Sequence, residues 1–331
     1  MRHALRAAIG VVALTLTGGA SAEARGALDY VAPQGLPVLP VTDGARVTVT
    51  WYGVTTLLFD DGETKILIDG FFSRAQFESL DDLAAPDKDH IAAMVQSAQL
   101  TGLAAITPVH SHFDHAMDLG EVALATGAVV LGSPSTANIA RGAGVPEERI
   151  RLAENTLTAT FGAFKVDLIR SAHAPLVDGG PPIPGTIDAP IMPPARIGDW
   201  KEGGSYTIVL AHPAGTALVQ GSAGYVEGRL DGVTADVVFL GTGGLATLGR
   251  EHASAYHAEI VAATGTECVV PIHWDDFTRP FGEVIFGGDE REMAWLREFA
   301  AESGAGGNLA VLPFAQPVDA FANDCVAGGG P

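Results

Sequence analysis

The sequence predicts a single α/β domain in which helices cover the outer faces of two β-sheets. Short apolar strands come first, helices and strands then alternate, and a second group of strands follows. An order of this kind indicates layered sheets with helices packed outside them. The length of 331 residues and the apolar fraction of 47% suffice for one large domain with a substantial core.

The opening strands are predicted by alternation of apolar and polar residues. Residues 46–51 and 54–59 alternate in this way, and residues 65–68 form a third apolar segment. The Asp-Asp-Gly run at 60–62 has the composition of a hairpin turn. We therefore expect an antiparallel meander, which follows a proline-containing lead-in over residues 23–44.

The middle and the end of the chain switch between helical and extended periodicity. Apolar residues at helical spacing predict a helix over 89–99, and the apolar run at 103–109 is typical of a buried strand. The other elements expected are helices from 118–125 and 251–264 and strands over 128–131, 164–170, 206–211, 216–220, 237–240 and 268–272.

The most informative stretch is His-Ser-His-Phe-Asp-His at 110–115, directly after the predicted strand 103–109. Alternate residues at a strand end point the same way, so His110 and His112 can share one target. Asp114 and His115 lie in the following turn and can face a second point nearby. Zinc and neighbouring first-row metals prefer imidazole and carboxylate ligands, whereas burying four such groups without a metal is costly. The stretch therefore predicts a metal site.

With this motif the chain resembles the metallo-β-lactamase superfamily. The H-x-H-x-D-H signature of the superfamily is present at 110–115, the segment 51–69 is similar to its opening hairpins, and Pro-Ile-His-Trp at 271–274 is similar to its final metal-binding strand. The matches cover nearly all of residues 23–331 in the expected order. The resemblance implies one domain with a four-layer αβ/βα sandwich, in which two mixed β-sheets have helices on both outer faces and metals at one edge.

The resemblance also implies six metal ligands in two groups and one acid that braces them. The more distant of these residues each follow a predicted strand, and strand ends at a sheet edge can converge. The first metal would be held by His110, His112 and His173, the second by Asp114, His115 and His273, and the bracing acid would be Asp69.

One position departs from the superfamily pattern. Most hydrolytic members carry a bridging Asp where this chain has Ser222, and a hydroxyl is a poorer metal ligand than a carboxylate. Two zinc ions are still favoured over one, with a weaker second site, because some β-lactamase subclasses have Ser near this point. Ser222 is expected either to hydrogen-bond a metal-coordinated water or to act structurally. His257 is expected either to reach the site from its helix or to be an ordinary residue of that helix without a role in the site.

The activity implied by the resemblance is metal-dependent hydrolysis. A metal with three neutral histidines keeps an open position for hydroxide, and Asp114 is the catalytic residue expected to orient that nucleophile. The expected substrate is an ester, lactone or phosphodiester of a small molecule or lipid. The alternatives are a β-lactamase of the type with Ser in place of the bridging acid and a protein that binds metal or ligand without turnover.

The N-terminus has the order of a secretory signal peptide. A basic start, an apolar run over 7–17 and Ala-Ser-Ala at 20–22 predict a signal over residues 1–22, and therefore a periplasmic or secreted protein. In such an oxidising compartment we expect Cys268 and Cys325 to pair.

Charge and composition limit the classes of molecule that the protein is expected to bind. The formal charge of −20 argues against nucleic-acid binding, because such a chain repels polyanions. No apolar run beyond the signal is long enough to span a membrane as a helix. Residues 174–204 contain seven prolines and six glycines, which predicts either disorder or a lid beside His173.

Overall fold

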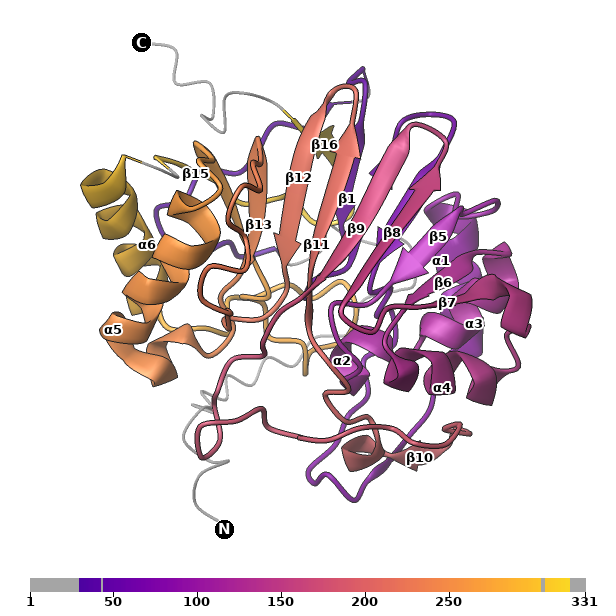
Figure 1. The fold of residues 1–331 in the computed structure, drawn as a ribbon. Helices are drawn as coiled ribbons and strands as arrows, with labels where there is room; N and C mark the ends of the chain where they lie inside the picture. The colour runs from indigo at the N-terminus through magenta and orange to yellow at the C-terminus, as the bar shows by residue number, and fades with distance from the viewer. Residues whose placement is uncertain (1–29, 43, 305–306, 322–331) are drawn as a thin grey trace, which may run out of the picture.

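Two seven-stranded sheets face each other in the computed structural model, which describes residues 30–42, 44–304 and 307–321 (Figure 1). Helices lie outside both sheets, which confirms the predicted sandwich. The predicted signal at 1–22 lies outside the described residues, and so does Cys325. Cys268, at the start of a strand of the second sheet, is disulfide-bonded.

The first sheet combines the opening meander with a parallel part. Strands β1, β2 and β3 pair antiparallel as predicted, and β3, β5, β6 and β7 run parallel. The carboxyl ends of β3 and β5 therefore meet at the same edge, where Asp69 and the histidine motif follow them. In sheet order the strands are β16 (Pro317–Asp319), β1 (Thr48–Trp51), β2 (Leu57–Asp60), β3 (Lys65–Ile68), β5 (Ala105–Thr107), β6 (Val129–Gly132) and β7 (Ile150–Leu152).

The second sheet has an antiparallel half and a parallel half. Strands β8, β9, β11 and β12 pair antiparallel, and β12, β13, β14 and β15 run parallel. In sheet order the strands are β15 (Asn308–Leu309), β14 (Cys268–Ile272), β13 (Val237–Gly241), β12 (Gly215–Gln220), β11 (Tyr206–His212), β9 (Phe164–Arg170) and β8 (Thr156–Phe161). A separate two-stranded pair joins β4 (Leu83–Ala84) to β10 (Ala195–Arg196).

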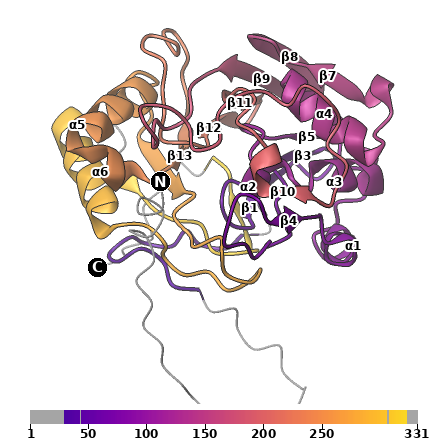
Figure 2. The same ribbon diagram turned by 90° about the horizontal axis from the view of Figure 1, so that it is seen from below.

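Helices complete the two outer layers. Those outside the first sheet are α1 (Lys88–Ser97), α3 (Leu119–Thr126) and α4 (Pro134–Ala143), and those outside the second are α5 (Leu245–His257) and α6 (Glu290–Ser303). The short helix α2 (Phe113–Ala116) lies between the layers at the edge of the two sheets that carries the predicted metal ligands, called the metal edge, as Figure 2 shows from below. Among the described residues, no helix has the length and apolar character needed to cross a bilayer. Single turns occur at Glu147–Arg149 and Ile197–Asp199, and a π-helical turn at Ala258–Ala262.

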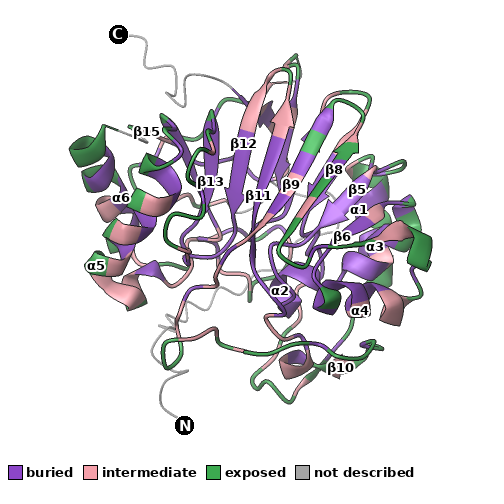
Figure 3. Cartoon of the chain, in the orientation of Figure 1, coloured by how far each residue is buried: buried purple, intermediate pink, exposed green. Residues whose placement is uncertain are grey.

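Apolar side chains from both sheets form the central core. Figure 3 colours the facing strands largely as buried. Phe59 of β2 and Phe239 of β13 meet edge to face across it, with ring centroids 5.6 Å apart. A second apolar cluster joins the first sheet to its outer helices through residues such as Leu67, Val122 and Ile139. These two layers of packing hold the strand ends, and thus the metal edge, in a fixed relation.

Several elements differ from the sequence-based expectation. Helix α4 was not predicted, because small and polar residues weaken its apolar periodicity. Its start nevertheless has a capping signal in the sequence. The Ser133 hydroxyl accepts a hydrogen bond from the Thr136 amide, and Pro134 is the first helical residue. Helix α6 was also not predicted. Strand β5 is shorter than expected, because the Val109 amide leaves the sheet and donates to the Asp69 carboxylate.

The proline-rich loop at 174–204 is held against the histidine motif and α4 at several points. The Glu202 amide donates to the Ile183 carbonyl at 2.8 Å, and the Ser111 amide donates to the Glu202 carbonyl at 3.0 Å. The Ile187 amide donates to the Ser135 hydroxyl at 2.9 Å. Residues 183–204 of this loop therefore form a wall of the metal edge rather than a disordered segment.

A buried glutamate gives the fold a pH-dependent stability. Glu292 of α6 is 1% exposed, and one of its oxygens accepts from the Ala246 amide at 3.0 Å. Its second oxygen has no hydrogen-bond partner among the described residues. Burial raises the pKa of Glu292 to about 7, against an ordinary value of 4.5.

We expect Glu292→Gln to flatten this pH dependence. Because the folded protein holds the proton more tightly, the Glu292 contribution is fully present below pH 4.5 and is lost as the pH rises through about 7. At pH 8 the variant should be more stable than the wild type by about 1–3 kcal/mol, and at pH 4.5 the two should match. Urea unfolding at both pH values measures this, with the exposed Glu290→Gln as control. An equal difference at both pH values would contradict the assignment.

Candidate metal centre

The six predicted ligands meet at one edge of the two sheets. Nitrogen or oxygen atoms of the first three lie within 4.8 Å of one another, and the same holds for the second three. The rings of His110 and His115 connect the two groups, with centroids 4.0 Å apart. The structure therefore has two neighbouring groups that could each hold a metal ion: His110, His112 and His173 in one, and Asp114, His115 and His273 in the other.

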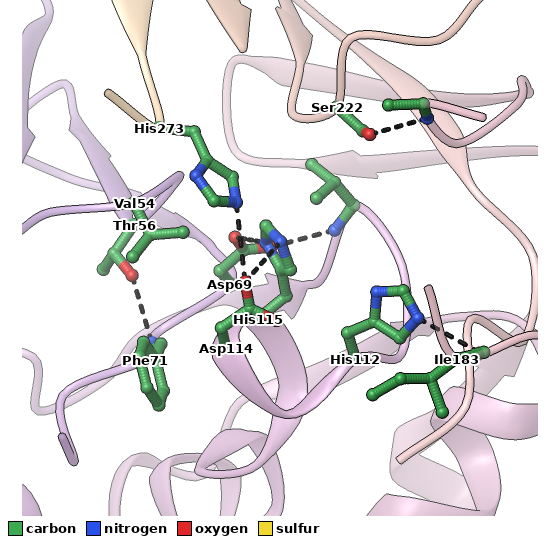
Figure 4. Close-up of polar contacts among 12 residues, drawn as sticks. Val54, Thr56, Asp69, Phe71, His112, Asp114, His115, Ile183, Ser222 and His273 are labelled. Carbon is green, nitrogen blue, oxygen red and sulfur yellow. Dashed lines mark hydrogen bonds and ion pairs between the residues drawn. The ribbon is translucent and has the colours of Figure 1, made fainter. Parts of the chain in front are cut away.

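In three of these histidines one ring nitrogen is held by a hydrogen bond, so the other is left for a metal. His112 uses Nε2 to donate to the Ile183 carbonyl at 3.2 Å, and His173 uses Nδ1 to donate to the Ala174 carbonyl at 2.8 Å. His115 uses Nδ1 to donate to the Asp69 carboxylate at 2.6 Å (Figure 4). Metal-binding histidines characteristically have their second nitrogen fixed in this way.

His110 gives the clearest test of whether a metal fits. Its side chain is 1% exposed, and neither ring nitrogen has a hydrogen-bond partner among the described residues. A buried polar group without a partner is costly, and a cation bound to one of the two ring nitrogens of His110 removes the cost at that nitrogen. The donor set of this structure therefore fits a divalent metal.

Electrostatics keep four of the six ligands in forms that bind metal, whereas for His115 burial is outweighed by Asp114 and Asp69, which raise its pKa. Burial, together with the neighbouring imidazoles, holds the pKa of His110 well below its ordinary value. Burial also lowers the pKa values of His112 and His173 to about 4, so these rings are neutral at pH 7. Burial opposes ionisation of Asp114, but His115 and His273 outweigh it and lower the pKa of Asp114. The second group thus contains an ionised carboxylate, whose Oδ2 lies 3.5 Å from Nε2 of both His115 and His273.

Asp69 braces the histidine motif, as the resemblance implied. It is fully buried at the end of β3, and its two oxygens accept from the Val109 amide and from His115 Nδ1. These bonds fix the start of the motif and one ligand ring together. Burial raises the pKa of Asp69, and the contacts to His115 and Val109 oppose that shift.

Strained backbone conformations gather at the metal edge. Asp69 and His273 have positive φ values of 58° and 56°, and nearby Val54 has 50°. Such values are uncommon for residues other than glycine and persist where surrounding contacts enforce them. Here the Val54 carbonyl accepts from the His273 amide at 2.9 Å, and the Val54 amide donates to Asp275 at 2.8 Å. This clamp holds His273 in place directly after β14.

Two supporting groups of the site and one buried acid beside it were missed by the sequence reasoning. These are the Ile183 carbonyl, the clamp between Val54 and Asp275, and the buried Asp118, which accepts from the Phe72 and Ser73 amides. A backbone carbonyl carries no sequence signal. Asp275, two residues after His273, and Asp118, three after His115, were visible as acids next to the motifs.

Ser222 and His257, for which the sequence left two roles open, make contacts within the fold and lie outside both ligand groups. The Ser222 hydroxyl accepts from the Ala174 amide at 3.0 Å, so it holds the turn that carries His173 and is in neither ligand group. His257 is buried and its ring packs against Phe299 of α6, with centroids 5.7 Å apart. It belongs to neither ligand group, because its helix faces α6.

A cavity of about 570 Å³ adjoins the first ligand group. His173 lines it together with Arg170, Tyr225 and His252, and the loop residues 179–181 form part of its wall. Gly224 permits this shape, since a Cβ there would lie 2.4 Å from the His173 backbone. A molecule in this cavity would therefore contact a metal-binding histidine directly.

Comparison with known proteins agrees with this arrangement. No family model matches the chain. A UPF0173 metal-dependent hydrolase of Rhizobium etli is 31% identical over 126 residues, which cover 38% of this chain and 47% of that protein. A counterpart from another strain of the same species is 29% identical over 127 residues. The matched region thus spans about half the length of these curated relatives.

Two solved structures have the same fold at low sequence identity. Igni18, a metallo hydrolase of Ignicoccus hospitalis, superposes with a TM-score of 0.50 at 15% identity, covering 82% of this chain and 97% of its own. CmlA, a diiron β-hydroxylase of Streptomyces venezuelae, also has a TM-score of 0.50 at 12% identity, covering 82% of this chain and 54% of its own. At such identities the likeness concerns the fold alone. In its signature motif, its paired sheets and the two candidate ligand groups at their edge the chain resembles the metallo-β-lactamase superfamily, and it shares the fold of Igni18.

Proposed function

We propose that this chain is an exported metal-dependent hydrolase that acts on an ester, a lactone or a phosphodiester of a small molecule or lipid. The observation that carries the proposal is the convergence of two three-residue ligand groups beside a 570 Å³ cavity. Export rests on the signal-like N-terminus. The relatives named metal-dependent hydrolases support the reaction class.

The proposed cofactor is zinc, with two ions. Three imidazoles form the first group and two imidazoles with one carboxylate form the second, and zinc takes both kinds of ligand. When bound, such ions make water acidic enough to attack near neutral pH and polarise the oxygen of a carbonyl or phosphoryl group.

Groups of the chain itself would orient the attacking water and fix the ligand rings. Asp114 is ionised and buried beside His115 and His273, so its carboxylate can orient the attacking water and accept a hydrogen bond from it. The Ile183 carbonyl and Asp69 fix the rings of His112 and His115. The wall formed by residues 183–204 limits the access of solvent to this edge.

The deciding experiment combines metal analysis with a substrate panel. We expect about two zinc ions per chain and turnover of at least one simple ester, lactone or bis-phosphodiester that ceases after chelation and returns with Zn²⁺. Full metal occupancy without turnover on the panel would favour the protein that binds without catalysis. Turnover confined to β-lactams would favour the lactamase alternative. Ser222 motivated that alternative, but its hydroxyl accepts a hydrogen bond from the Ala174 amide.

Arg170 is expected to influence which substrates bind. It lines the cavity, its guanidinium lies over the Tyr206 ring at 5.6 Å from the centroid, and it takes part in none of the ion pairs found among the described residues. The guanidinium therefore has donors to offer to an anionic or acceptor-rich part of a substrate.

We expect Arg170→Gln to raise KM about tenfold for substrates with an anionic group and to change kcat by about twofold or less. Arg170→Lys should restore part of the affinity, because it keeps the charge but not the planar set of donors. Steady-state kinetics on a neutral ester and its carboxylate-bearing analogue measures the effect. Equal changes in KM for both esters would contradict a role in recognising charge.

A further inference from the structure

We propose that Arg74 is a positioning residue of the second ligand group and that it acts on His273 through Asp275. The proposal rests on the metal centre proposed above and not on any particular substrate. Arg74 lies in the segment that follows β3 and belongs to neither ligand group. Any effect of Arg74 on a bound ion is therefore transmitted by the residues between them.

The charged groups of Arg74 and Asp275 approach the same point of the backbone, at Gly53. A Cβ on Gly53 would lie 2.4 Å from Arg74 Nη2 and 2.9 Å from Asp275 Oδ2. Gly53 also has a φ of 92°, which favours glycine, so no side chain separates the two groups. Asp275 is 7% exposed, and opposite charges this close attract where water screens them poorly.

Backbone carbonyls and aromatic rings hold the Arg74 guanidinium in this position. Its Nη1 donates to the Phe71 carbonyl at 3.3 Å, and its Nη2 donates to the Tyr52 carbonyl at 3.1 Å. The guanidinium carbon also lies 4.6 Å from the centroid of the Phe71 ring and 5.5 Å from that of Phe281. The positive charge is therefore fixed beside Asp275 from two sides.

The electrostatics of Arg74 agree with a pairing to Asp275. Burial lowers the pKa of Arg74, and the charges of Asp275, Asp118 and Asp114 oppose that shift, Asp275 most strongly. A guanidinium keeps its proton at any ordinary pH, so the charge beside Asp275 is permanent. Arg74 takes part in none of the direct ion pairs found among the described residues, so its charge acts on Asp275 across a short gap.

The effect reaches the metal centre through the clamp. Asp275 Oδ1 accepts from the Val54 amide at 2.8 Å, and the Val54 carbonyl accepts from the His273 amide at 2.9 Å. The positive φ values of Val54 and His273 persist only while such contacts enforce them. Without the charge of Arg74 the Asp275 carboxylate is free to turn toward water, which releases Val54 and then His273. His273 belongs to the second ligand group alone, so the first group should be unaffected.

The first test measures zinc binding by Arg74→Met, which keeps an apolar stem and removes the charge. Competition with a zinc indicator should show one ion bound as in the wild type and the other about 10–100-fold more weakly. Loss of a positive charge would by itself strengthen cation binding, so weaker binding reveals the loss of positioning. Arg74→Lys keeps the charge and should recover part of the affinity. Arg149→Met is the matched control, because Arg149 donates to the Ala123 carbonyl of α3.

The second test follows amide hydrogen exchange in the metal-free full chain, so it does not depend on zinc or turnover. The Val54 and His273 amides should exchange about tenfold faster in Arg74→Met, while the amides of β9 keep their wild-type rates. In an Asp275→Asn background, Arg74→Met should have little further effect on exchange or zinc affinity, because the charge it acts on is gone.

Three results would each overturn the role of Arg74. These are unchanged exchange at Val54 and His273, equal weakening of both zinc ions, and full additivity of Arg74→Met with Asp275→Asn. A wild type that binds one zinc ion would instead contradict the two-ion cofactor, and exchange in the metal-free chain would still decide the role of Arg74.

Discussion

Asp114→Asn is expected to leave the protein folded and to reduce kcat by about 10²–10⁴-fold. The side chain of Asp114 lies in the first turn of α2, and its close polar contacts are the two ligand histidines of the second group. Asparagine has nearly the same shape, so packing is retained. It lacks the negative charge that the second group offers a cation and the oxygen that orients the attacking water.

Three measurements separate this effect from unfolding. Circular dichroism melting should give a similar midpoint for the variant and the wild type in metal-free buffer. Metal analysis should show that the second ion is lost more readily, and kinetics on the best substrate of the panel should show the fall in kcat. Asp89→Asn, an exposed acid in the first turn of α1, is the matched control and should behave as wild type. Undiminished turnover by Asp114→Asn would refute the assigned role.

The fold and the convergence of the six candidate ligands could be predicted from the sequence for identifiable physical reasons. Strands such as 164–170 and 268–272 carry strong apolar runs, and they were found with their correct or nearly correct bounds. His173 and His273 follow these strands, so chain order already brought them to a sheet edge. The histidine motif is dense enough to indicate a metal without any knowledge of the fold.

The rest could not be read from residue patterns, because it depends on backbone geometry. The Ile183 carbonyl reaches His112 only after the 174–204 loop has folded against α4. The positive φ values of His273 and Val54 accompany the hydrogen bond from the His273 amide to the Val54 carbonyl. No local sequence pattern predicts them. Ser222 illustrates the same limit, since its position in the chain marked it as a site residue and only the contact to Ala174 reveals its partner.

The second large effect is expected for Asp69→Asn, which should weaken zinc binding about 10–100-fold. The carboxylate accepts from two donors, the Val109 amide and His115 Nδ1. An asparagine has one oxygen, so its amide nitrogen must face one of these donors. Either His115 turns or a buried donor stays unpaired, and stability should also fall by about 1–3 kcal/mol.

Asp118→Asn provides the matched comparison, because Asp118 is an equally buried acid close to the same motif. Its Oδ2 accepts hydrogen bonds from both the Phe72 and the Ser73 amide, while Oδ1 has no hydrogen-bond partner among the described residues. An asparagine can keep both bonds with its single oxygen, and no metal ligand depends on them. Competition with a zinc indicator should therefore show weaker binding for Asp69→Asn and wild-type binding for Asp118→Asn. If both variants bind zinc as the wild type does, the bond from His115 to Asp69 does not control the metal centre, and the ring is held by the metal itself.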